Sequence, residues 1–353
     1  MSRQHATVCN LDAQTTPAIA PTPTLVATPA ELAEQLPIAP MLAARIGHQR
    51  DLIRAILAGR DDRLLIVAGP CSLHDRASAL DYGARLAELA AECADDAVLV
   101  MRAYVEKPRT TIGWKGLLHD PHLDGSNDIG AGLAAARGLL IELAELGLPV
   151  ATELLTPIAA DYLSDVLSWA AIGARTTESQ THRERASALD LPVGFKNGTD
   201  GAIGTAIDAI AAASHPQHYL GTDRHGRPAA IATPGNPDAH LILRGGRGGA
   251  NHDVESVARA RGALAALGCP ERLIVDCSHA NSGKVAARQA EVMAELGARR
   301  RAGEQAIAGV MLESHIEHGK QALGGDLAYG VSITDECLGW QATAEAIRAA
   351  CDR

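Results

Sequence analysis

Short apolar runs alternate along the chain with longer segments rich in alanine and leucine. The short runs have the length and composition of buried strands, and the longer segments have the spacing of amphipathic helices. Regular alternation of the two is typical of repeated βα units around a parallel sheet. Eight such runs occur, at residues 64–71, 97–105, 148–155, 169–174, 192–197, 240–246, 273–281 and 308–315.

A polar residue stands at or just past the end of each run. In an eight-stranded parallel barrel these positions share one rim, where such folds build their active sites. An open doubly wound sheet would instead place its ligand at a single switch point. We therefore predict an α/β protein with a (β/α)8, or TIM, barrel that works as an enzyme. The residues at the predicted rim are Cys71, Arg102 with Lys107, Glu153, Arg175, Lys196, Arg244, His279 and Glu313.

Three segments lie outside the regular alternation. Residues 1–40 are rich in Thr, Pro and Ala and predict an extended arm, in which Thr28 before Pro29 and Glu31 predicts a capping box and a short helix. Residues 41–60 predict a leading helix, and the stretch at about 218–233 predicts an inserted β-hairpin. We thus expect an N-terminal arm over 1–40 and a catalytic barrel over 41–353.

Basic residues gather at the predicted rim although the chain has a formal net charge of -10. Arginine offers a planar fork that bonds carboxylate or phosphate oxygens in pairs, and lysine adds a compact charge. Each cation alone could be a solvated surface group, but a cluster at strand ends predicts a site for two phosphates, or for a phosphate and a carboxylate. The cluster comprises Arg102, Lys107, Arg109, Arg175, Lys196 and Arg244.

A second set of residues has the chemistry of metal ligands. Cys71, His279, Glu313 and Asp335 offer one sulfur, one imidazole and two carboxylates from four separate loops. This mixture suits Mn²⁺, Fe²⁺, Co²⁺ or Zn²⁺ better than Mg²⁺ or Ca²⁺, which prefer oxygen alone. No close spacing ties the four together, so the alternatives His74, His315 and Cys277 remain open as ligands.

Composition narrows the class of partner. The acidic balance, with a sequence pI of about 5.8, gives no global basic field for nucleic acid or an anionic membrane surface, so the expected partner is a small molecule. Seven cysteines are scattered without pairing spacings, which fits a reducing compartment. There is no signal-peptide core and no apolar run long enough for a membrane span. We expect a cytoplasmic protein.

Seven longer stretches carry a resemblance to one family. AGPCSLHD, MRAYVEKPRTTIGWKGLLHDP, GARTTESQTHRE, PVGFKNGTDG, HLILRGG, DCSHANS and YGVSITDECLGW resemble the type I synthases of 3-deoxy-D-arabino-heptulosonate 7-phosphate (DAHP) in the shikimate pathway. The resemblance runs from about residue 41 to the C-terminus, with the motifs in the family's order. It implies a TIM barrel that condenses phosphoenolpyruvate with erythrose 4-phosphate and uses one divalent metal ion.

The resemblance also implies roles for individual residues. The metal would be held by Cys71, His279, Glu313 and Asp335. Phosphoenolpyruvate would place its phosphate on Arg175, Lys196 and Arg244, near the backbone N–H of Ala174, and its carboxylate on Arg102, Lys107 and Lys196. The phosphate of erythrose 4-phosphate would meet Arg109 and Thr110. The sequence departs from the family pattern at none of these positions.

Catalytic roles follow from the chemistry of the two substrates. The metal would make the aldehyde more electrophilic, and the cationic cluster would offset the repulsion between two anions. We expect Lys107 to protonate the new hydroxyl and His279 or Asp335 to act as general base toward water.

Three other functions remain as alternatives. A Schiff-base aldolase would use Lys196 as nucleophile, after burial had lowered its pKa, and would leave Cys71 and Glu313 without a purpose. A related synthase would take arabinose 5-phosphate, although KPRTT resembles the four-carbon enzyme more. A non-catalytic sugar-phosphate sensor would need no metal ligands.

Regulation and assembly are expectations from the family alone. Members are usually homo-oligomers inhibited by an aromatic amino acid, so we expect such an effector and a homodimer or homotetramer. The single Phe and low aromatic content identify no stacking platform that would select Phe, Tyr or Trp.

Overall fold

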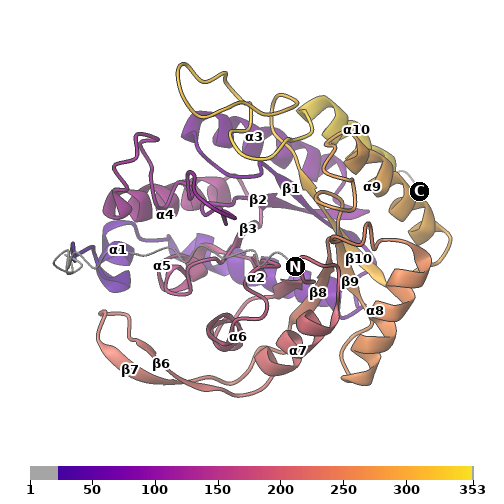
Figure 1. Cartoon of the computed structure of the whole chain (residues 1–353), viewed down its shortest axis with the longest axis horizontal. Coiled ribbons are helices and arrows are strands. Elements are labelled where there is room, and N and C mark those ends of the chain that lie inside the picture. The colour runs from indigo at the N-terminus through magenta and orange to yellow at the C-terminus, as the bar shows by residue number, and fades with distance from the viewer. Residues whose placement is uncertain (1–22, 352–353) are drawn as a thin grey trace, which may run out of the picture.

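The protein is a closed eight-stranded parallel barrel surrounded by helices, as the sequence predicts (Figure 1). The computed structural model describes residues 23–351. Around the barrel the strands follow the order β1-β10-β9-β8-β5-β4-β3-β2. The barrel strands are β1 (Leu64–Gly69), β2 (Ala97–Arg102), β3 (Val150–Glu153), β4 (Trp169–Ile172), β5 (Val193–Lys196), β8 (Ala239–Leu243), β9 (Leu273–Asp276) and β10 (Ile307–Glu313).

Each of the eight barrel strands is buried along its whole length because helices cover the outside of the barrel and apolar side chains fill its interior. None of the helices within residues 23–351 is long and apolar enough to cross a bilayer. The helices that follow the strands are α3 (Arg76–Glu92), α4 (Ile129–Glu145), α5 (Ala159–Leu163) with the 3-10 turn η1 (Ser164–Val166), α6 (Gln180–Ser187), α7 (Gly204–Ala213), α8 (Val254–Ala266), α9 (Arg288–Arg301) and α10 (Trp340–Cys351).

The leading helix α2 (Pro40–Leu57) closes the amino-terminal end of the barrel. Its Ile53 and Ile56 are fully buried and pack with inward side chains of the strands, such as Leu65 and Val67. The opposite end is thus left as the mouth at which the strands finish.

Shortening a buried side chain of α2 should destabilise the barrel, because α2 closes its amino-terminal end. We expect Ile56→Ala to lower the free energy of unfolding by about 2–5 kcal/mol, because it leaves a cavity in a close-packed core. Met41 lies in the same helix with 78% of its surface exposed, so Met41→Ala should change the free energy by less than about 0.5 kcal/mol. Denaturant titration of both variants measures these changes. Equal losses of unfolding free energy in the two variants would show that α2 does not close the barrel core through Ile56.

The hairpin and the arm lie together on the outside of the barrel. The antiparallel strands β6 (His218–Thr222) and β7 (Pro228–Ala232) form the predicted hairpin, which runs along the edge of the molecule in Figure 1. In α1 (Pro29–Gln35), Thr28 and Glu31 form the predicted capping box, and the Ala30 N–H donates to Arg224 O at the hairpin turn (2.9 Å). The remainder of the predicted arm, residues 1–22, lies outside the described residues.

Candidate active site

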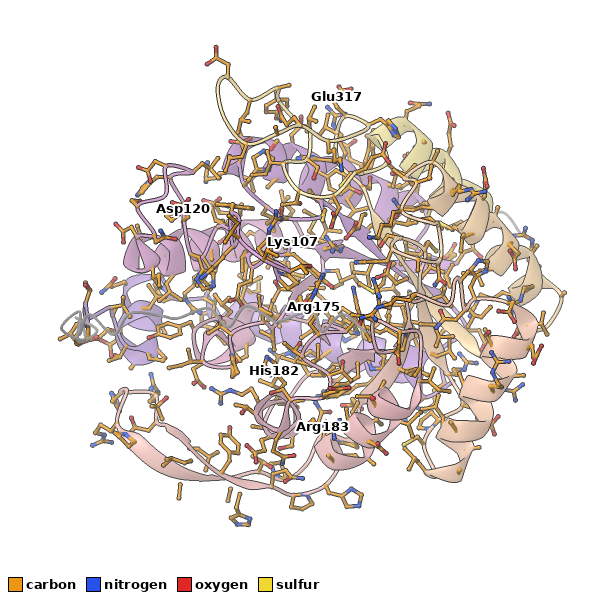
Figure 2. The ribbon with its side chains drawn as sticks, viewed as in Figure 1. Lys107, Asp120, Arg175, His182, Arg183 and Glu317 are labelled. Atoms are coloured by element: carbon orange, nitrogen blue, oxygen red, sulfur yellow. The ribbon has the colours of Figure 1, made fainter. Side chains whose placement is uncertain are left out.

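A pocket of about 420 Å³ opens at the carboxyl ends of the barrel strands. In Figure 2, Lys107 and Arg175 lie near the middle of the molecule, over this mouth, whereas Asp120 and Glu317 lie farther out. The structure brings every predicted site residue to the pocket wall except Cys71, which is fully buried and contacts Lys107 of the wall. The predicted residues in the wall are Arg102, Lys107, Arg109, Thr110, Ala174, Arg175, Lys196, Arg244, His279, Glu313 and Asp335.

Three of the four predicted metal ligands form one group. Ligand atoms of Cys71, Glu313 and Asp335 all lie within 4.8 Å of one another. Cys71 follows β1 and Glu313 ends β10, and these strands pair side by side, so the barrel closure itself joins the two residues. Asp335 comes from the long segment between β10 and α10, whose Cys337 accepts a hydrogen bond from the Cys71 N–H (3.4 Å).

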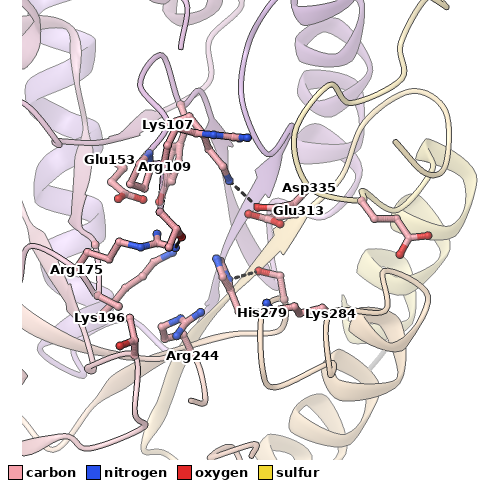
Figure 3. Close-up of a pocket in the computed structure, with 18 of the residues that line it drawn as sticks. Lys107, Arg109, Glu153, Arg175, Lys196, Arg244, His279, Lys284, Glu313 and Asp335 are labelled. Atoms are coloured by element: carbon pink, nitrogen blue, oxygen red, sulfur yellow. Dashed lines mark hydrogen bonds and ion pairs between the residues drawn. The ribbon is translucent and has the colours of Figure 1, made fainter. Parts of the chain in front are cut away.

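The fourth predicted ligand, His279, is not part of this group. Its Nδ1 instead lies 2.7 Å from Ser278 Oγ and 3.0 Å from Asp276 Oδ2. The ring lies on the same side of the pocket as Glu313 and Asp335 (Figure 3). His74 and His315 are buried but do not join the group, and neither does Cys277.

Lys107 connects the sulfur and carboxylate groups. Its ammonium donates to Cys71 Sγ (2.8 Å) and to Asp335 Oδ2 (2.7 Å), as Figure 3 shows for Asp335. Burial would lower the pKa of Lys107, but Cys71, Glu313 and Asp335 outweigh it and raise the pKa. Burial and Glu313 both raise the pKa of the Cys71 thiol. The group therefore stabilises the charged form of Lys107.

Arg102 joins the anionic group to the floor of the pocket. Its guanidinium donates to Glu313 Oε1 (2.9 Å) and to Pro70 O, and its Cζ lies 3.7 Å from the centroid of the Tyr104 ring. Burial would raise the pKa of Glu313, but Arg102, His279 and Lys107 hold it below the usual value. Glu313 is thus kept as a carboxylate at neutral pH, in the form that can bind a metal.

Lys196 is held by a buried ion pair. It ends β5, and its Nζ lies 3.0 Å from Oδ2 of Asp276 at the end of β9. Burial would lower the pKa of Lys196, but Asp276 and the nearby Tyr104 and Glu153 raise it. A Schiff-base lysine needs a lowered pKa to be a nucleophile. This environment therefore disfavours the aldolase alternative.

The other half of the pocket holds cations without carboxylate partners. Arg109, Arg175 and Arg244 form no ion pair with any group in residues 23–351. Arg175 donates to Thr110 Oγ1 (3.1 Å), and burial lowers the pKa of Arg244. Such a cluster of guanidinium groups has the chemistry to bind phosphate oxygens in pairs.

Several residues of the site did not emerge as candidates from the sequence, and four of them are charged or aromatic groups in or beneath the cationic part of the wall. Lys284 and Lys320 add two further cations to the wall, while Asp276 and Tyr104 lie beneath the cationic residues. Lys284 and Asp276 flank the predicted His279 loop, which was the available signal. Lys320 does not stand at a strand end, so the sequence pattern does not mark it. It reaches the wall because the long segment after β10 folds back over the mouth.

Comparison with known proteins identifies the family of this barrel. A family model described as "DAHP synthetase I family" matches residues 34–348. The chain belongs to this family. Among solved structures, a phospho-2-dehydro-3-deoxyheptonate aldolase from Francisella tularensis SCHU S4 superposes with a TM-score of 0.92 at 39% identity, covering 94% of this chain and 97% of the other.

Curated relatives in the family are enzymes distinguished by their effector. The chain is 50% identical to the Tyr-sensitive phospho-2-dehydro-3-deoxyheptonate aldolase of Escherichia coli K12, over 91% of each chain. It is 50% identical to the Phe-sensitive enzyme of the same strain, over 91% of this chain and 92% of the other. It is 51% identical to the Trp-sensitive enzyme of Enterobacter agglomerans, over 89% and 90%. The resemblance found in the sequence is confirmed.

Proposed function

We propose that the protein is a DAHP synthase, which condenses phosphoenolpyruvate with erythrose 4-phosphate and water to give DAHP and phosphate, the first step of aromatic amino acid biosynthesis. One observation carries the proposal beyond family membership. Unpaired guanidinium groups, at Arg175 and Arg244, share a single pocket with the Cys71, Glu313 and Asp335 group. That combination suits phosphorylated anions reacting beside a bound cation.

The donor set fits a divalent transition metal. DAHP synthases are metal-dependent in general, and Cys71, Glu313 and Asp335 would hold the ion here, with His279 as the fourth ligand. Sulfur, nitrogen and oxygen together favour Mn²⁺, Fe²⁺, Co²⁺ or Zn²⁺. When bound, the ion supplies Lewis-acid polarisation of the aldehyde of the second substrate.

The chain's own residues would bind and orient the two substrates. Arg175, Arg244 and Lys196, with the Ala174 N–H, take the phosphate of phosphoenolpyruvate, and Arg102, Lys107 and Lys196 take its carboxylate. Arg109 and Thr110 take the phosphate of erythrose 4-phosphate. Holding both anions in one cationic pocket offsets their mutual repulsion and fixes the reacting carbons near each other. The assigned residues are Arg102, Lys107, Arg109, Thr110, Ala174, Arg175, Lys196 and Arg244.

The proposed reaction has two bond-forming steps. Carbon 3 of phosphoenolpyruvate attacks the aldehyde carbon, and Lys107 donates a proton to the oxygen that becomes the new hydroxyl. Water then adds at carbon 2, with His279 or Asp335 taking its proton. Phosphate leaves by cleavage of its bond to carbon 2, while the new hydroxyl on that carbon gives its proton to the departing phosphate and becomes the carbonyl of the product. The position of the Lys107 ammonium supports its role as proton donor, because the ammonium is held at the pocket wall between Cys71 and Asp335.

A phosphate-release assay distinguishes the proposal from its rivals. The metal-replete protein should release phosphate from phosphoenolpyruvate with erythrose 4-phosphate at least about tenfold faster than with arabinose 5-phosphate, and a chelator should stop the reaction. Faster release with arabinose 5-phosphate would favour the related synthase. Binding without turnover would favour a sensor, and borohydride trapping of an adduct on Lys196 would favour a Schiff-base aldolase.

Regulation is proposed to act through the arm and the hairpin, with an aromatic amino acid as effector. The described part of the arm contacts the hairpin through Ala30 and α5 through Ala27, whose carbonyl accepts from Tyr162 Oη (2.9 Å), and none of its residues lines the pocket. A catalytic unit over 41–353, a homodimer or homotetramer and a cytoplasmic location also remain proposals.

Deletion of residues 1–40 should weaken inhibition or assembly more than catalysis, because none of the described residues of this segment, 23–40, lines the pocket. Inhibition by Phe, Tyr and Trp and the subunit number in sedimentation would be compared with the full chain. Unchanged inhibition and unchanged subunit number would contradict this role.

A further inference from the structure

Asp276 is a buried carboxylate that faces both halves of the active site. It is 2% exposed, and its Oδ2 lies 3.0 Å from Lys196 Nζ and 3.0 Å from His279 Nδ1. We propose that Asp276 is a positioning residue that, with Ser278, fixes the proton of His279 on Nδ1 and so presents Nε2 as the basic nitrogen. The inference deepens the proposed function, because Nε2 would then serve as the fourth metal ligand, and Asp335 rather than His279 would then be the general base toward water.

The direction of each hydrogen bond follows from the chemistry of the partners. Asp276 is buried against the ammonium of Lys196, so it is a carboxylate and can only accept. Ser278 Oγ lies 2.6 Å from Asp276 Oδ1 and therefore gives its single proton to that oxygen. Ser278 Oγ can then only accept from His279 Nδ1 at 2.7 Å. Both neighbours of Nδ1 are acceptors, so Nδ1 carries the proton.

The backbone leaves the imidazole little freedom to find other partners. His279 adopts a left-handed conformation with φ of 57°, which is uncommon for a residue other than glycine. The Lys284 N–H donates to His279 O (2.7 Å), and Asn281 Nδ2 donates to Asp276 O (2.9 Å), so the loop closes on the end of β9. Strain of this kind persists only where the surroundings hold it, and it is concentrated at functional sites.

Asp276 therefore acts on metal binding through His279. Metal-binding histidines commonly give their other N–H to a carboxylate, and loss of that partner weakens metal affinity by about 10–100-fold. In Asp276→Asn the amide has one acceptor oxygen in place of two carboxylate oxygens. It therefore cannot accept hydrogen bonds from Lys196, Ser278 and His279 together. In Ser278→Ala the 3.0 Å contact between Asp276 and His279 remains, so the loss of affinity should be smaller.

The test combines metal affinity with the protonation of the ring. Co²⁺ affinity, measured by competition with a chelator, should fall about 10–100-fold in Asp276→Asn and less than about tenfold in Ser278→Ala. Asp165→Asn is the control, because it removes the partner of the buried Arg137 far from the pocket and should leave Co²⁺ affinity unchanged. Equal Co²⁺ affinity in wild type and Asp276→Asn would overturn the proposal.

A second measurement does not depend on how the variants fold. Nitrogen-15 NMR of the metal-free wild type, with the His279 signals assigned from their loss in His279→Gln, should show the Nδ1–H tautomer. A predominant Nε2–H tautomer would overturn the inference. Failure of the proposed function is seen separately, as absence of phosphate release by wild type in the two-substrate assay.

Discussion

Replacement of Cys71 by serine should abolish most of the activity and most of the bound metal together. Serine places a hard oxygen where the fully buried sulfur stands against Glu313 and Asp335, and the proposed metal site would lose its thiolate ligand. We expect kcat/KM for DAHP formation to fall by at least about 10³-fold, because both the polarisation and the position of the aldehyde would depend on the proposed metal ion. Elemental analysis and the phosphate-release assay measure the two effects.

Cys269→Ser is the matched control for this substitution. Cys269 is half-buried at the other end of the barrel, in the connection before β9 and away from the pocket. Its variant should keep the metal content and turnover of wild type. If Cys71→Ser also kept both, Cys71 would have no place in a metal site.

Lys107→Met should remove turnover without removing the metal. Its ammonium contacts Cys71 and Asp335 and would serve as proton donor, so we expect kcat to fall by about 10²–10⁴-fold. Metal content should not fall, because a competing cation has been taken from the ligand group. This combination separates Lys107→Met from Cys71→Ser, in which metal and turnover are lost together.

Lys115→Met is the control, since Lys115 is exposed on the same loop and lies outside the pocket wall. It should retain wild-type kcat. Undiminished turnover in Lys107→Met would exclude Lys107 as the proton donor.

The barrel was predictable because each buried strand of a parallel sheet is a short continuous run of apolar residues in the sequence. All eight apolar runs became strands of the closed barrel, and the capping box at Thr28 and the hairpin formed where they were expected. The short helix α6, with the sequence QTHRERAS, is mostly polar and has no apolar stripe to reveal it. Its position is set by the chain length between β4 and β5 and by packing, which local periodicity does not record.

The sequence predicted which side chains lie together at the mouth of the barrel, but not which of them pair with one another. Parallel strands all finish at one rim, so a residue at a strand end is a site candidate without any further information. The partner of each residue depends on the barrel order. Lys196 and Asp276 meet because β5 and β9 are both neighbours of β8, although 79 residues separate them in the chain (276 minus 196, less one).

In the proposed metal site, four side chains hold one transition-metal ion that faces the arginine cluster. Anomalous diffraction from crystals of the protein with Mn²⁺ and phosphoenolpyruvate tests it most directly. We predict one anomalous peak at about 2.0–2.4 Å from Cys71 Sγ, His279 Nε2 and carboxylate oxygens of Glu313 and Asp335. The phosphate of phosphoenolpyruvate should lie on Arg175 and Arg244. A peak elsewhere in the molecule, or a phosphate bound away from these two arginines, would contradict the account.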